Sequence, residues 1–158
     1  MNTLIIFGAK YLFLLSPILV LFFFFKLSFE MRKRVAIFAL ISVPLALILF
    51  ALARMIWFNP RPFMLSGVAP LIPHDPGNGF PSGHTLFTAI LATLVTYFNR
   101  KTAAVLWIIT LVVGVSRVYA GVHHLVDIGG SILIALLSGA YAYAIIHKPW
   151  KNKHRANF

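Results

Sequence analysis

The chain has 158 residues, of which 60% are hydrophobic and only 11% charged. Soluble domains carry about 25% charged residues, so this composition cannot cover a soluble globular surface and indicates an integral membrane protein. The sequence contains no cysteine, which excludes a disulfide framework, thiol catalysis and zinc–thiolate or iron–sulfur sites.

The N-terminal half predicts two membrane helices and a long loop. The first apolar run, residues 4–25, is interrupted only by Lys10. It ends in four phenylalanines and a lysine rather than a small-residue cleavage site, so we expect a retained helix. The second run, residues 35–57, has Arg54 near its far end. Residues 58–81 hold six of the nine prolines and predict a loop, and loops of this length are usually functional.

The C-terminal half predicts three more helices. The third run begins after His84 and ends at Phe98. The fourth covers about 103–120 with Arg117 in its last turns, and the fifth covers about 126–146 with Asp127 in its first turn. A membrane helix needs about 20 residues, which leaves no room for a second domain. We therefore expect residues 1–158 to form a single all-α, polytopic membrane helix bundle with about five transmembrane helices.

The basic residues predict the topology. Ten of the 14 Lys and Arg residues lie in segment 26–34, at 100–101 or in the C-terminal tail, which is expected to be the cytoplasmic side. The same clustering is typical of membrane loops, so the net charge of +11 does not indicate a nucleic-acid partner. The other four, Lys10, Arg54, Arg61 and Arg117, are predicted at the outer side, facing the periplasm or cell exterior.

The outer side also collects most of the ionisable groups that are not cytoplasmic anchors. A charged residue inside a span costs roughly 2.5–3.5 kcal/mol, so such residues tend to be functional, although a single arginine could also reach the interface with its side chain. The ionisable residues expected to converge on this face are Arg54, Arg61, His74, Asp75, His84, Arg117, His123, His124 and Asp127.

The spacing of His123 and Asp127 predicts a hydrogen-bonded pair. Four residues apart at the start of a helix, they share one face, and the carboxylate can accept from one imidazole nitrogen. The other nitrogen is then free to act as a nucleophile. His124 is three residues from Asp127 and could compete, or could be a polar residue at the membrane interface.

Pro81-Ser82-Gly83-His84 precedes the third helix. Ser82 could cap the helix, and Gly83 lets backbone N–H groups approach a ligand, which makes an anion site at the helix N-terminus. The alternative is an ordinary N-terminus with an incidental histidine.

Three arginines and a helix N-terminus together describe a phosphate receptor. Two histidines would supply a nucleophile and an acid for the leaving oxygen. A metal site built from His84, His123 and Asp127 is the alternative, but three neighbouring cations would oppose a divalent metal. We expect no metal and no cofactor.

The motifs, taken in order, resemble the type-2 phosphatidic acid phosphatase superfamily. They are Arg54-x6-Arg61-Pro62, Pro81-Ser82-Gly83-His84 and Ser116-Arg117-x5-His123-x3-Asp127, within residues 54–130. The chain departs from the family in having Arg54 where lysine is usual and five predicted helices where six are common. Asn59-Pro60-Arg61-Pro62-Phe63, Leu71-Ile72-Pro73-His74 and Gly121-Val122-His123-His124 look most like the bacterial undecaprenyl-diphosphate phosphatase, or bacitracin-resistance, branch.

The resemblance implies hydrolysis without a metal. His123 would attack phosphorus to form a phosphohistidine, Asp127 would orient it, and His84 would protonate the departing oxygen. The phosphoryl oxygens would be held by Arg54, Arg61, Arg117, Ser82 and Gly83.

The sequence therefore predicts a phosphatase in the bacterial cytoplasmic membrane, with undecaprenyl diphosphate as substrate at the outer face and a part in peptidoglycan biosynthesis and bacitracin resistance. The alternatives are another lipid phosphate (phosphatidylglycerophosphate, lipid A 1-phosphate or phosphatidic acid) or, in a different class, an anion or lipid-phosphate transporter. His74 could donate to a second phosphate or simply form a turn with Asp75. The expected partners are the lipid phosphate and the bilayer, and the sequence indicates no protein partner.

Overall fold

The computed structural model describes the backbone of residues 2–155 and the side chains of residues 2–146. The described part of the chain is helical, with one isolated bridge, between Pro60 and Asn78, in place of any strand. This confirms the all-α fold. The elements are α1 Asn2–Lys10, the 3-10 helix η1 Leu12–Leu14, α2 Leu15–Lys26, α3 Phe29–Ile56, α4 Pro62–Ser66, α5 Gly83–Thr96, α6 Arg100–Tyr119 and α7 Leu125–Arg155.

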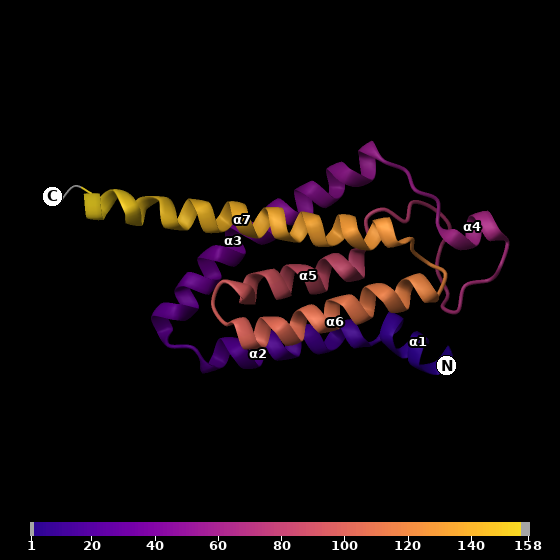
Figure 1. The fold of residues 1–158 in the computed structure, drawn as a ribbon, viewed down its shortest axis with the longest axis horizontal. Helices are drawn as coiled ribbons and strands as arrows, with labels where there is room; N and C mark the ends of the chain where they lie inside the picture. The colour runs from indigo at the N-terminus through magenta and orange to yellow at the C-terminus, as the bar shows by residue number, and fades with distance from the viewer. Residues whose placement is uncertain (1, 156–158) are drawn as a thin grey trace.

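Helix α5 lies at the centre of the bundle and packs against α6, α7, α3 and α2 (Figure 1). Its buried positions are mostly small or β-branched, including Thr85, Thr88, Ala89 and Ala92, so neighbouring helices approach closely. One core cluster joins α5 to α3 and α7 through Leu86, Ala46 and Ala135, and another joins it to α2 and α6 through residues 23, 95 and 106.

The helices differ in their ability to cross a membrane. Among the described residues, α3, α6 and residues 125–146 of α7 are long and apolar enough. If the bent pair formed by α1 and residues 12–26 counts as one further span, the total is four. Helix α5, with 14 residues, is shorter than a full crossing. The predicted count of about five spans is therefore not confirmed. Large apolar side chains such as Leu40 and Ile108 point outward, as expected of a lipid-facing surface.

The first apolar run is not the single helix that the sequence predicted. It is broken between Lys10 and Leu15, with a bend of 42°. Pro17 explains the break, because proline cannot donate to the carbonyl of Phe13 and its ring would clash with that carbonyl in a continuous helix. The predicted loop 58–81 also contains a short helix, α4, which begins with Pro62 at its first position, where proline is favoured.

The two ends of the bundle differ in chemistry. At the right-hand end of Figure 1, the start of α5 and of α7 meets the ends of α3 and α6, the loop with α4, and α1. The turns between α2 and α3 and between α5 and α6 lie at the opposite end. The outer-side residues of the sequence prediction thus gather at one end of the fold, away from the basic clusters at 26–34 and 100–101.

Candidate active site

His123 and Asp127 form the buried centre of the candidate site. The Nδ1 atom of His123 lies 3.2 Å from Oδ2 of Asp127, and the two residues are 3% and 0% exposed. The same carboxylate accepts from the Asn59 side-chain amide at 2.8 Å and from the backbone N–H of His124 at 2.8 Å. Three donors thus fix the carboxylate, and it in turn fixes the imidazole ring.

The backbone around the pair allows this close packing. His123 follows a turn in which Gly121 adopts a φ of 76°, the left-handed conformation that favours glycine. Across the site, a side chain at Gly79 would meet Oδ2 of Asp127 at 2.9 Å, so only glycine lets this loop lie against the carboxylate. Asn78 anchors the same loop by accepting from the backbone N–H of Asn59 at 3.0 Å.

His123 is set up as a neutral base. Burial lowers its pKa, the hydrogen bond to Asp127 opposes that effect, and the nearby Arg117 and Arg61 lower the pKa further. A neutral ring that donates from Nδ1 to the carboxylate keeps a lone pair on Nε2. Nη1 of Arg61 lies 3.5 Å from that nitrogen.

Arg61 and Arg117 supply positive charge without an acidic partner. Arg61 donates to the carbonyl of Val122 at 3.0 Å, and Arg117 donates to the carbonyl of Ala9 at 2.9 Å. Both are buried, and the Nε of each lacks a hydrogen-bond partner within residues 2–146. No carboxylate within that range pairs with either guanidinium. Buried, unpaired cations of this kind suit an anionic ligand.

His74 lies beside Arg117 and His123. Its Nε2 lies 3.0 Å from Nη2 of Arg117, and its ring centroid lies 6.1 Å from that of His123. Burial, and then the charges of Arg61 and Arg117, lower the pKa of His74 to about 4. A neutral His74 accepts the hydrogen bond from Arg117, so the loop helps to orient that guanidinium.

His84 stands in the first turn of α5, facing the break in the first helix. Its ring packs edge-on against Phe13 of η1, with centroids 4.6 Å apart. It lines a cavity of about 260 Å³ together with Lys10, Ile72, Pro73, His74 and Arg117. The cavity is large enough for a phosphate group, and its lining includes two histidines, an arginine and a lysine.

Ser82 and Gly83 take different places from those expected. Ser82 occupies the N-cap position of α5, but its side chain caps no backbone N–H, and its buried hydroxyl accepts from Thr85 at 3.1 Å instead. The predicted side-chain cap is therefore wrong. Gly83 is exposed with open space around it, which leaves the first turn of α5 accessible to a ligand.

Three predicted residues lie at the edge. Arg54 is exposed, donates to the carbonyl of Asn78 at 3.3 Å and lies over the ring of Phe50, away from the cavity. Asp75 is also exposed. The His124 ring bonds to the carbonyl of Pro60 at 3.1 Å, so His124 does not compete for Asp127 through its side chain but supports it through its backbone.

The sequence reasoning assigned no role to Asn59, or to Ala9 and Lys10 of the first helix. Asn59 belongs to the motif Asn59-Pro60-Arg61-Pro62-Phe63, and its side-chain amide donates to the buried carboxylate of Asp127. Lys10 is the one charged residue in the apolar run 4–25, which by itself bears only on the membrane topology.

The alternative metal site is not assembled. Among the residues with described side chains, no three His, Cys, Asp or Glu form a group that could hold a metal ion. His123 and Asp127 bind each other, and His84 faces Phe13.

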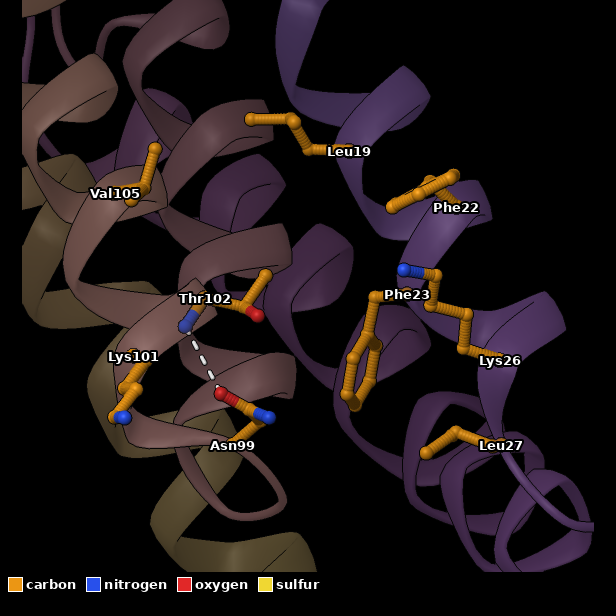
Figure 2. Close-up of a pocket in the computed structure, with 9 residues that line it drawn as sticks. All are labelled: Leu19, Phe22, Phe23, Lys26, Leu27, Asn99, Lys101, Thr102 and Val105. Carbon is orange, nitrogen blue, oxygen red and sulfur yellow. Dashed lines mark hydrogen bonds between the residues drawn. The ribbon is translucent and has the colours of Figure 1, made fainter.

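A second cavity, of about 550 Å³, lies at the opposite end between α2 and α6 (Figure 2). Figure 2 shows Lys26 and Lys101 beside apolar side chains, with Asn99 bonded to the backbone N–H of Thr102. It is larger than the cavity beside His84, but its lining contains no histidine and no carboxylate. The histidines at 74, 84 and 123 and Asp127 lie at the other end of the bundle.

A helical membrane bundle whose buried histidine–aspartate pair adjoins unpaired arginines is the architecture of a membrane phosphatase. The family model described as the PAP2 superfamily matches residues 33–151, and the chain belongs to that superfamily. The match confirms the resemblance drawn from the sequence motifs, and the protein is a membrane lipid phosphatase of this superfamily.

The chain is also similar in sequence or fold to several individual proteins. The chain is 30% identical over 139 residues to the undecaprenyl-diphosphatase BcrC of Bacillus subtilis, covering 88% of this chain and 72% of that protein. It is 31% identical over 113 residues to the bacitracin transport permease protein BcrC of Bacillus licheniformis, covering 71% of this chain but only 56% of the relative. The crystal structure of Aquifex aeolicus LpxE superposes with a TM-score of 0.66 at 26% identity, covering 89% of this chain and 81% of LpxE.

Proposed function

We propose that this phosphatase hydrolyses undecaprenyl diphosphate to undecaprenyl phosphate and inorganic phosphate at the outer face of the bacterial cytoplasmic membrane. The observation that carries the proposal is the His123–Asp127 pair beside Arg61 and Arg117, two buried arginines with no acidic partner. The name of the Bacillus subtilis relative supports the choice of substrate. Recycling of this lipid carrier would give the protein a part in peptidoglycan synthesis and in bacitracin resistance.

The proposed reaction has two steps. In the first, Nε2 of His123 attacks the terminal phosphorus, a nitrogen–phosphorus bond forms, and the bond from phosphorus to the bridging oxygen breaks. Burial and then the charge of Arg117 lower the pKa of His84 to about 4, and the negative charge of the bound diphosphate would raise it again, so that His84 gives its proton to the departing oxygen. In the second step, water attacks the phosphohistidine, returns its proton to His84, and releases inorganic phosphate. The net reaction consumes one water and needs no redox partner.

The surrounding groups support both steps. Asp127 stabilises the ring of His123 as positive charge develops on it. Arg61 and Arg117 bind the equatorial phosphoryl oxygens and offset their negative charge. The open first turn of α5 at Gly83 adds backbone donors. We assign Arg54 an outer role, since it is exposed and one of its nitrogens donates to the carbonyl of Asn78.

Transport of an anion is the rival function, and the name of the Bacillus licheniformis relative, a bacitracin transport permease protein, favours it. A transport site also uses buried arginines, and the broken first helix has a counterpart in transporters. However, a hydrogen bond that orients one imidazole through Nδ1, so that Nε2 faces Arg61 and the site, is needed for nucleophilic attack and not for passage of an anion.

The deciding experiment is phosphate release by purified protein in detergent. The panel contains undecaprenyl diphosphate, phosphatidylglycerophosphate, lipid A 1-phosphate and phosphatidic acid, and His123→Ala serves as the inactive control. We expect the highest kcat/KM for undecaprenyl diphosphate. A higher value for another member would replace the substrate, and release from none of them would favour the transporter.

A further inference from the structure

Lys10 lines the same cavity as His84, His74 and Arg117. In the sequence, Lys10 is only a single charge that interrupts an apolar run. In the structure it is the last residue of α1, immediately before the break. Its side chain is exposed, and its Nζ lies 5.3 Å from the centroid of the Tyr11 ring, so nothing buries the ammonium group.

Packing fixes the backbone of α1 at this point. Ala9 is fully buried in a cluster with Ile72, Ala120 and Val122, which joins α1 to the loop and to the end of α6. Gly8 lies so close to Ser116 that any side chain there would collide with its hydroxyl. Lys10 is therefore held on the rim of the cavity by its neighbours, while its own side chain lies exposed over the ring of Tyr11.

A diphosphate substrate brings two negatively charged phosphate groups to the site. The transferred phosphoryl group is bound by Arg61 and Arg117, but the phosphate that stays on the lipid also carries negative charge. His74 is poorly placed to neutralise it, because its Nε2 already accepts from Arg117. A lysine with three donors on a flexible stem suits a second phosphate whose position changes with the lipid.

We infer that Lys10 binds the phosphate retained on the lipid and so selects diphosphates over monophosphates, an inference that rests on the proposed function. Lys10 contacts the substrate without taking part in the bond changes. Its loss is expected to lower transition-state stabilisation only for substrates that possess the second phosphate.

The test uses two substrates with the same lipid, farnesyl diphosphate and farnesyl monophosphate. Lys10→Met should lower kcat/KM for the diphosphate about tenfold or more, as for a lost charge-assisted contact, and change the monophosphate value less than twofold. Lys10→Arg should recover most of the loss. Lys101→Met, which removes an exposed lysine at the opposite end of the bundle, is the matched control and should leave both values unchanged.

The experiment distinguishes failure of the proposed role of Lys10 from failure of the proposed function. Equal losses on both substrates, or no loss on either, would overturn the role of Lys10 while wild-type turnover still supported the lipid phosphatase. If the wild-type protein hydrolysed neither substrate, nor undecaprenyl diphosphate, the proposed function would fall and this inference with it.

Discussion

Arg117 donates from Nη1 to the backbone carbonyl of Ala9, 2.9 Å away and 108 residues earlier in the chain. That carbonyl lies in the last turn of α1, where helix carbonyls lack intrahelical donors. The break in the first helix thus gives Arg117, the arginine proposed to bind phosphate, its acceptor. The same segment contributes Phe13 to His84 and Lys10 to the cavity, so the first helix builds one wall of the candidate site.

This relationship makes Gly8 a sensitive position. Gly8→Ala would push α1 away from Ser116 and so separate Arg117 from Ala9. Overpacking costs about 1–3 kcal/mol, so we expect a Tm several degrees lower and turnover reduced about tenfold. The matched control is Gly129→Ala, also in a helix but with open space around it, which should be neutral. Identical behaviour of the two variants would show that α1 does not hold the site.

His84 is expected to act on the leaving group. His84→Ala should lower kcat about 10²–10⁴-fold for lipid phosphates, whose alkoxide or phosphate leaving groups need a proton. For p-nitrophenyl phosphate, whose leaving group departs without one, the loss should be much smaller. Steady-state kinetics on both substrates check this, and equal losses would mean that His84 only binds or shapes the site.

His74 predicts a loss of stability in acid. Its pKa falls from the usual 6.5 to about 4 in the folded protein, because of burial and then of the charges of Arg61 and Arg117. The unfolded chain therefore binds more protons between these values, and the free energy of unfolding decreases as pH falls from 6.5 towards 4. Thermal unfolding in detergent should show this slope, and His74→Gln should reduce it. An unchanged slope in the variant would remove His74 as a cause.

The predicted topology can be tested because the chain has no cysteine. Ala69 and Lys101 are both exposed and lie at opposite ends of the bundle. Gly77 is a poorer choice for a cysteine, since its φ of 138° would strain any side chain. An impermeant maleimide should label Ala69→Cys in intact cells and Lys101→Cys only after permeabilisation. The reverse pattern would place the site on the cytoplasmic side.

Local spacing predicted the chemical centre well. The four-residue interval between His123 and Asp127 predicted a hydrogen bond, and the structure contains it at 3.2 Å. The motifs containing Arg61, Arg117 and His84 also predicted which residues meet at one end of the bundle. The predicted reason for the His123–Asp127 contact was wrong in part, however, because α7 begins only after His123, so the pair meets at the start of the helix and does not share a helix face. The motifs themselves are short segments, which can be read from a single chain.

Contacts between distant segments could not be predicted in this way. Asn59 bonds to Asp127 across 68 residues, and this pairing depends on how the long loop packs on α7. The break in the first helix had a local cause in Pro17, yet Pro44 lies within α3 without interrupting it. Whether a proline ends a membrane helix thus depends on the packing around it as well as on the residue itself.

The most direct test of the account is to trap the phosphoryl group on His123. Wild-type protein is mixed in EDTA with undecaprenyl diphosphate labelled at the terminal phosphate, quenched in alkali, and mapped by mass spectrometry, with His123→Ala as the control. The account predicts an acid-labile phosphoryl group on His123, none in the variant, and turnover unaffected by EDTA. Phosphate release with no label on His123, or activity that EDTA abolishes and zinc or magnesium restores, would contradict it.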